Sequence, residues 1–192
     1  MNIDHELVKK VQAGNKKAFD ILVIKYQQRI LSVVNGFVHD PTEAQDVMQE
    51  AFIKAYRAIK NFRGESAFYT WLYRIAINTA KNHLTAKSRR PPASDIIIDD
   101  AQTSDVSELK EIETPENRLI SDELAKVIAT TISTLPNETA VAIKLREFEG
   151  MSYEEIAQVM SCPIGTVRSR IFRAREMIDK QIRTVIGDEN EK

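Results

Sequence analysis

The chain has 192 residues, of which 43% are hydrophobic and 29% charged, enough for one or two small domains with compact cores. Its uncharged apolar runs are far shorter than the roughly 18 residues that a membrane span requires, and its first residues contain no apolar secretory core. We therefore expect a cytoplasmic protein. The single cysteine, Cys162, excludes an internal disulfide and a cysteine-based zinc site; it is either a small core residue or a redox sensor.

The formal net charge of −1 argues at first against a nucleic-acid-binding protein, but the charges are unevenly distributed. Residues 54–90 carry nine Lys or Arg and one acid, residues 95–123 carry ten acids and two bases, and residues 164–183 carry six bases and two acids. Two basic blocks separated by an acidic block indicate two surfaces that face nucleic acid, with a segment between them that does not bind it.

The first part of the chain shows helical periodicity with clear boundary residues. Asp40 and Pro41 supply an N-cap and a first helical residue, and Ser66 is the expected N-cap of a later helix. The expected helices cover residues 4–13, 19–38, 41–60 and 66–85.

Beyond this part, residues 91–115 hold three prolines and a negative excess, which is typical of a flexible linker. Within it, Ile96–Ile98 either docks on a partner or touches one of the chain's own domains. Helices resume near Glu116, break at Leu135-Pro136-Asn137, and continue over residues 138–148.

Without a strand pattern of useful length, the sequence predicts an all-α fold of two small helical domains joined by an acidic linker. The expected boundaries are 1–90, 91–115 and 116–192.

A helix-turn-helix is predicted over residues 153–172, in the stretch SYEEIAQVMSCPIGTVRSRIFRAR. Val167, Ile171, Ala174 and Ile178 recur at helical spacing and form a buried face, which turns four other side chains toward solvent. A second helix that presents arginine, serine and an aromatic ring is suited to reading the major groove. An ordinary helical hairpin with a solvated basic face is the alternative. The outward residues are Arg168, Ser169, Phe172 and Arg173.

A second unusual stretch, FRGESAFYTWLY at residues 62–73, holds five of the 13 aromatic residues, including the only tryptophan. Trp71 and Asn78 share a helical face, with Arg74 nearby. Unpaired bases stack on aromatic faces, and cations bind phosphates. This composition therefore favours a binding site for single-stranded nucleic acid. The alternative is that Trp71 belongs to the core below a solvated basic face.

Catalytic and metal-binding patterns are missing from the sequence: it has no phosphate-binding glycine loop, no HExxH and no Ser-His-Asp pattern. Its three histidines, His5, His39 and His83, have no ligand-like spacing. We expect a protein that is not an enzyme, with no cofactor, no metal and no small-molecule substrate, and that acts as part of a larger machine.

Two long motifs, DVMQEAFIKAYRAIKNFRGESAFYTWLYRIAINTAKNHL and SYEEIAQVMSCPIGTVRSRIFRARE, resemble the extracytoplasmic-function (group four) bacterial sigma factors, and most of all their sigma-E branch. The resemblance implies sigma region two, a linker and sigma region four. It also implies a promoter-specificity subunit of RNA polymerase that serves an envelope-stress regulon. The implied partners are core RNA polymerase, promoter DNA and a membrane-anchored anti-sigma factor that holds the chain at the inner membrane.

The resemblance further implies site residues. Those that dock on the clamp helices of the largest polymerase subunit are Asp46, Gln49, Glu50 and Ile53. Those that line the site for the melted minus-ten element are Phe62, Arg63, Ser66, Trp71, Arg74, Asn78 and Lys81. Those that contact the minus-thirty-five element are Arg146, for a phosphate, and Arg168, Ser169, Phe172 and Arg173 in the major groove.

Arg170 and Arg175 are implied either to touch the DNA backbone or to pair with acids of their own domain. Two other classes of protein fit parts of the sequence: a self-sufficient helix-turn-helix repressor or activator, for which no dimerisation helix is evident, and an RNA-binding helical protein.

Overall fold

The computed structural model describes residues 3–89 and 115–189, with side chains described for residues 3–89 and 123–185. The described residues form α-helices and one short 3-10 helix, with no strand among them. The all-α prediction of two small helical domains is confirmed. The predicted linker lies outside the described residues apart from Pro115, as does the stretch Ile96–Ile98.

The N-terminal domain contains four α-helices and a 3-10 turn. Their apolar faces meet in one core, in which Leu22, Ile30, Leu72 and Tyr73 are fully buried. Burying such faces supplies most of the stability of helices in small domains. The elements are α1 (Ile3–Gln12), α2 (Lys16–Val34), α3 (Pro41–Ala58), η1 (Ile59–Asn61) and α4 (Phe68–Ser88).

Side-chain capping marks the start of α2, α3 and α7. The Asp40 side chain accepts a hydrogen bond from the Glu43 amide at 2.8 Å, which satisfies a free N–H at the start of α3. The prediction of Ser66 as the N-cap of α4 is wrong by one residue. The cap is Ala67, whose backbone is extended and which offers no side-chain oxygen; Ser66 instead lies in the preceding loop.

The C-terminal domain contains α5 (Pro115–Thr134), α6 (Asn137–Glu147), α7 (Tyr153–Met160) and α8 (Ile164–Glu189). Ser152 and Glu155 form a reciprocal capping box at the start of α7. The predicted buried face of α8 is confirmed at Val167, Ile171 and Ala174, which are at most 1% exposed, whereas Ile178 is only half-buried.

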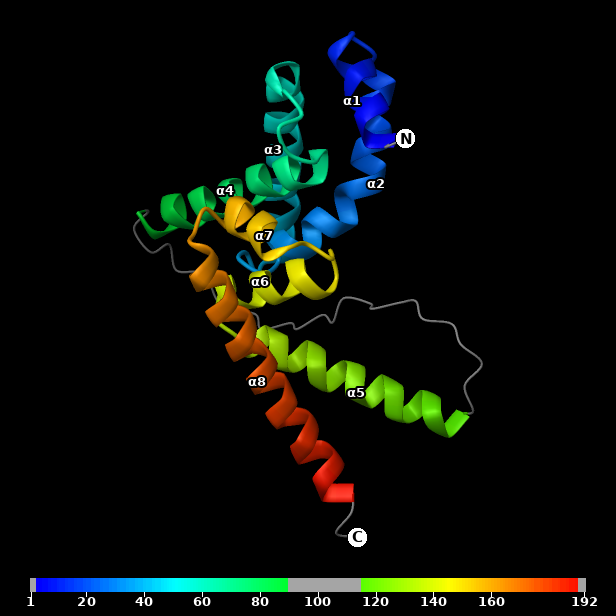
Figure 1. Cartoon of the computed structure of the whole chain (residues 1–192), viewed down its shortest axis with the longest axis vertical. Helices are drawn as coiled ribbons and strands as arrows, with labels where there is room; N and C mark the ends of the chain where they lie inside the picture. The colour runs from blue at the N-terminus through cyan, green and yellow to red at the C-terminus, as the bar shows by residue number, and fades with distance from the viewer. Residues whose placement is uncertain (1–2, 90–114, 190–192) are drawn as a thin grey trace.

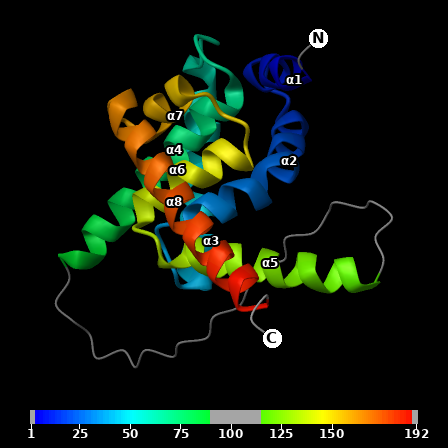
Figure 2. The same cartoon turned by 60° about the horizontal axis from the view of Figure 1, so that its bottom comes forward.

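The two domains pack against each other. In both views α7 lies against α4, and α6 lies below it beside α2 (Figures 1 and 2). The two domains come close at Gly36, just beyond the C-cap of α2. A Cβ there would lie 2.6 Å from the Val141 side chain of α6, so a larger residue would force a shift. Buried residues of both domains form one continuous apolar cluster.

In the part of the chain that the structure describes, no helix is both long and apolar enough to cross a membrane.

Ser161, between α7 and α8, adopts a left-handed backbone with φ 54° and ψ 47°. This region is costly for residues with a Cβ and free for glycine. We expect Ser161→Gly to raise the free energy of unfolding by about 1 kcal/mol, because relief of strain exceeds the added entropy of the unfolded chain. Urea denaturation measures this. Ser161→Ala keeps the Cβ and should bring no gain; equal stabilisation by both variants would contradict the explanation.

Candidate nucleic-acid and polymerase interfaces

The predicted recognition helix is α8, and its first two turns are open to solvent. Phe172 is 63% exposed, and Arg168, Ser169 and Arg173 are also exposed. Beneath them, Val167 and Ile171 anchor the helix to the core. A rigid helix that carries two arginines, a hydroxyl and an aromatic ring on its free face has the shape and donors that fit a major groove.

Three further arginines of this domain have protein partners. Arg170 pairs with Glu138 of α6, and Arg175 pairs with Glu147 at 2.6 Å. Of the two alternatives for this pair of arginines, the structure shows pairing with acids of their own domain. Arg146 donates a hydrogen bond to the Met151 carbonyl at 2.7 Å.

Two arginines of this surface lie near the ring of Tyr153. The guanidinium carbons of Arg146 and Arg168 are 4.9 Å and 5.9 Å from its centroid. Such cation–π contacts limit the freedom of both side chains. Arg146 therefore braces the loop before α7 and contacts the same ring as a residue of the recognition helix.

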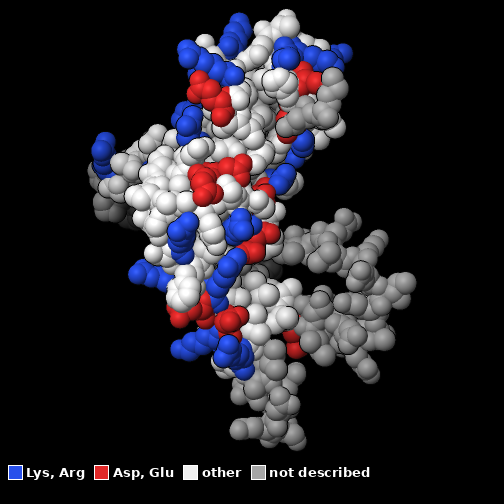
Figure 3. Space-filling view, viewed as in Figure 1, with Lys and Arg blue, Asp and Glu red and all other residues white. Residues whose placement is uncertain are grey.

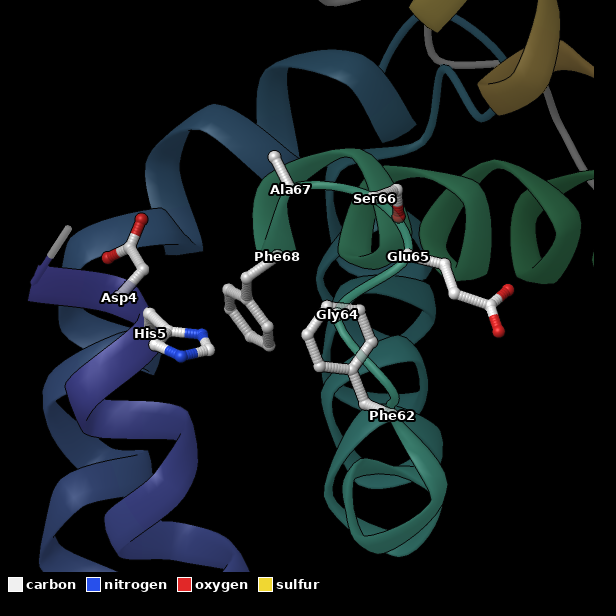
Figure 4. Close-up of a pocket in the computed structure, with 8 residues that line it drawn as sticks. All are labelled: Asp4, His5, Phe62, Gly64, Glu65, Ser66, Ala67 and Phe68. Atoms are coloured by element: carbon white, nitrogen blue, oxygen red, sulfur yellow. The ribbon is translucent and has the colours of Figure 1, made fainter.

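A hollow of about 440 Å³ lies between α1 and the loop that joins η1 to α4 (Figure 4). The rings of His5, Phe62 and Phe68 face the space, whereas the Glu65 carboxylate points away from it (Figure 4). Gly64 allows the loop to turn, with φ +75°. The full lining is Asp4, His5, Phe62, Gly64, Glu65, Ser66, Ala67 and Phe68.

The loop is held from α1. The Gln12 side-chain amide donates hydrogen bonds at 2.9 Å to the carbonyls of Ile59 and Phe62. Asp4, although 5% exposed, accepts from the Tyr26 hydroxyl and from Lys25, so its charge is compensated. These contacts hold α1 and the loop, which form the two sides of the hollow, in place.

Trp71 was expected either to stack on single-stranded nucleic acid or to belong to the core, and the structure agrees with each in part. Its ring is half-buried and lies 5.0 Å from Phe62 and 5.8 Å from Phe68, measured between centroids. One helical turn further on, Arg74 and then Asn78 are exposed on the same side of α4. Of the predicted minus-ten set, the structure thus places Phe62 and Ser66 at the hollow and Trp71 against Phe62.

The last two residues of the predicted minus-ten set differ in their exposure to solvent. Arg63 is exposed in the loop, whereas Lys81 is half-buried and pairs with Glu138 of the other domain at 2.8 Å. Burial, followed by the positive charge of Arg170, lowers the pKa of Lys81 below its usual value.

The predicted polymerase-docking residues share one exposed face of α3, with spacings of three, one and three residues. Ile53 is 51% exposed there, and Glu50 pairs with Lys54 at 2.8 Å. An apolar side chain among acids is suited to a basic, partly apolar partner helix. The residues are Asp46, Gln49, Glu50 and Ile53.

On the visible face of the molecule, acidic side chains gather at the middle, where Figure 1 places α7 (Figure 3). Basic and acidic side chains are mixed above this patch, on the N-terminal domain, and below it, along α8 (Figure 3). Among the described residues, no group of three or more His, Cys, Asp or Glu is placed to hold a metal ion.

Sequence reasoning missed the α1 side of the hollow, namely Asp4, His5 and Gln12. These residues lie about 50 positions before the loop that they contact. In the sequence they look like ordinary polar residues of a short helix, so no local pattern marks them.

Two family models match the chain: sigma-70 region 2 over residues 22–90, and sigma-70 region 4 over residues 125–178. RNA polymerase sigma-H factor of Pseudomonas aeruginosa is 60% identical over 96% of each chain. ECF RNA polymerase sigma-E factor of Escherichia coli K12 is 54% identical over 95% of this chain and 96% of that one.

Among solved structures, CnrH in complex with the cytosolic domain of CnrY is 26% identical, with a TM-score of 0.64, and covers 95% of this chain and 99% of that chain. The sigma factor RpoE of Bartonella quintana, in complex with the anti-sigma factor NepR, is 20% identical, with a TM-score of 0.67 over 87% of this chain and 98% of that one, and shares the fold.

The region 2 and region 4 matches define the class of protein as an RNA polymerase sigma factor, which is a transcription initiation factor. Its relatives are similar over nearly the whole chain, and the chain belongs to the extracytoplasmic-function (ECF) branch of the sigma-70 family.

The hydrogen bond from Arg146 to Met151 gives this arginine a measurable structural role without DNA. We expect Arg146→Ala to lower the free energy of unfolding by about 2 kcal/mol, because a charged donor and its carbonyl partner are separated. Urea denaturation of the free protein measures the loss. Arg173→Ala, at an exposed position of the same surface, should stay within about 0.5 kcal/mol of the parent. Equal stability of all three proteins would show that Arg146 does not brace the loop.

Proposed function

We propose that the chain is an alternative sigma factor that binds core RNA polymerase and directs initiation at promoters of an envelope-stress regulon. One observation carries the proposal: a free recognition face on α8 and an aromatic hollow beside the basic helix α4 occur in one chain. A repressor needs the first feature but not the second. The family membership supports the same function.

In this proposal, residues 1–90 dock on polymerase and capture the melted minus-ten element, and residues 116–192 bind the minus-thirty-five element. Residues 91–115 connect them and thread into the polymerase near the RNA path. Their negative charge fits surfaces that bind nucleic acid, but it does not attract promoter DNA.

The minus-ten site would work by stacking and capture. A base that leaves the duplex enters the hollow, where it stacks on the ring of Phe62, which Phe68 supports edge-on. The Ser66 hydroxyl and the loop backbone offer polar groups to its edge. Trp71, Arg74 and Asn78 then extend the surface along α4, with the arginine held near the phosphates.

Docking on polymerase would use the exposed face of α3. Asp46 and Glu50 attract a basic partner surface, and Ile53 becomes buried when the partner helix arrives. This face is free on the described structure, so it is available before DNA is bound.

Regulation would come from a membrane-anchored anti-sigma factor that covers docking surfaces of both domains. CnrH, with 26% identity along 95% of this chain, is bound to the cytosolic domain of CnrY, which supports a partner of this kind. We infer that the chain acts in the cytoplasm and is held at the inner membrane in its inhibited form. The sigma-E relatives support the envelope-stress assignment.

Run-off transcription with purified core polymerase on a promoter library tests the function directly. The chain should associate with core and direct transcription from a narrow set of promoters. A chain that binds duplex operators as a dimer but never associates with core would instead be a repressor, and binding to RNA hairpins without polymerase would favour an RNA-binding protein.

Loss of a recognition-helix arginine should weaken upstream-element binding. We expect Arg168→Ala or Arg173→Ala to cost about 1–3 kcal/mol if each reads a base edge with two hydrogen bonds. Footprinting of holoenzyme on a selected promoter measures the loss. Lys180→Ala removes an exposed cation later in α8 and serves as the control. An unchanged footprint in both arginine variants would refute the recognition-helix assignment.

Removal of the aromatic surface should affect strand separation more than initial binding. We expect Trp71→Ala to reduce stabilisation of the open complex by about 1–3 kcal/mol, the usual contribution of one base–aromatic stack. Permanganate reactivity of unpaired thymines measures opening, and gel shifts at low temperature measure closed-complex binding. Asn78→Ala should act in the same direction. Normal opening in both variants would refute the single-strand role.

A further inference from the structure

The loop between η1 and α4 receives two hydrogen bonds from a residue that lies outside it. The Gln12 side chain on α1 donates at 2.9 Å to the carbonyl of Ile59 and at 2.9 Å to that of Phe62. Helix ends leave carbonyls without intrahelical partners, and these two lie where α3 and η1 end. A side chain that is 47 and 50 positions earlier in the sequence therefore holds the start of the loop.

The Gln12 side chain is a rigid and specific anchor. It is the last residue of α1, whose Leu7, Val8 and Val11 are buried in the core of the domain. Its amide nitrogen carries two N–H donors and no charge, which matches the two carbonyls that it contacts. Among uncharged side chains only asparagine offers the same pair of donors, on a shorter stem.

The position of the Phe62 carbonyl matters because the groups at the hollow follow it directly. The Phe62 ring faces the hollow and lies edge-on to Phe68, at 6.0 Å between centroids and 86° between planes (Figure 4). Gly64 comes two residues later with φ +75°, a conformation that glycine adopts freely. A loop with such freedom has many accessible shapes, so the anchor before Gly64 restricts where the Phe62 ring and the Ser66 hydroxyl lie.

We propose that Gln12 is a positioning residue for minus-ten recognition: by holding the Phe62 carbonyl, it keeps the loop in the shape that selects the base entering the hollow. The inference rests on the proposed function for the presence of that base. Gln12 is not among the residues that line the hollow, so it acts through the loop and not by contact with DNA. Base preference at the hollow is therefore set in part from α1.

Trp71, the only tryptophan of the chain, reports the position of the loop without DNA. Its ring lies 5.0 Å from the Phe62 ring, measured between centroids. Gln12→Met has a similar length but no donor, so it should release the Phe62 carbonyl and loosen this ring contact. We expect a red-shifted Trp71 emission and stronger quenching by acrylamide in Gln12→Met than in the parent. Unchanged emission and quenching would overturn the positioning role.

Gln27→Met is the matched control. It makes the same substitution at another half-buried glutamine of the same domain, on α2, that does not line the hollow. Its Trp71 emission should equal that of the parent, and a red shift as large as that of Gln12→Met would count against the explanation.

Gln12→Glu is a second variant in case Gln12→Met folds poorly. It keeps the size and polarity of the side chain, but an ionised carboxylate only accepts hydrogen bonds and cannot donate to the two carbonyls. It should therefore change the Trp71 emission in the same direction as Gln12→Met.

Base selectivity is measured with holoenzyme on a fork of the promoter selected in the run-off assay, with its minus-ten strand unpaired. In the parent, abasic substitution along this strand identifies the base that enters the hollow. Its removal should weaken binding about 5- to 150-fold, the contribution of one stacked base. Both Gln12 variants should bind the intact fork about fivefold more weakly than the parent, or worse, but should bind the abasic fork within about twofold of it. Gln27→Met should match the parent on both forks.

The two forks separate a selective role from a general one. An equal loss on the intact and abasic forks would make Gln12 a general structural residue and overturn the proposal, as would full affinity for the intact fork. A parent that tolerates an abasic site at every minus-ten position, or never associates with core polymerase, would refute the proposed function and with it the minus-ten role. The Trp71 measurement would still show whether Gln12 positions the loop.

Discussion

The carboxylate of Glu138 is the constraint on which the arrangement of the two domains depends. It pairs with Lys81 of the other domain and with Arg170 of its own, so one carboxylate faces two cations in a half-buried position. Removing the carboxylate would leave both cations without this partner near the contact between the domains. The apolar contact between Gly36 and Val141 also holds the domains together, because the glycine allows the backbone to approach the valine side chain closely.

The packing within each domain differs from the contacts between the domains. The aromatic rings at the hollow and the buried face of α8 are held by apolar packing within one domain. The contacts between domains combine apolar packing, as at Gly36 and Val141, with polar pairs such as Arg29–Glu149 and Lys81–Glu138. Within each domain the predicted DNA-binding surface is thus already formed, and a change in the domain arrangement need not rebuild it.

Much of the fold was predictable because its determinants are local. The periodicity of α8, the Asp40 cap and the break at Leu135-Pro136-Asn137 are all visible within a few residues of sequence. The cap of α4 was misplaced because Ser66 is the better capping residue in isolation, yet the loop places it toward the hollow. Tertiary position overrode local preference there.

The contacts between the domains and the α1 side of the hollow were not predictable, for a shared physical reason. Glu138 and Glu149 have the spacing of ordinary solvated helix charges, and only the folded chain shows which cations they face. The pairing of residues far apart in sequence depends on how the domains pack, and nothing in the neighbouring residues encodes it. Arg170 is the exception, since pairing within its own domain was one of two alternatives.

The two hydrogen bonds from Gln12 have a consequence for engineering promoter preference. The loop before α4 owes its position to an amide on α1, which lies outside the motif that would normally be exchanged between relatives. A transplanted loop would therefore reach a foreign scaffold without the group that holds its carbonyls. Exchange of promoter specificity requires that the first helix be moved together with the loop, as one portable unit.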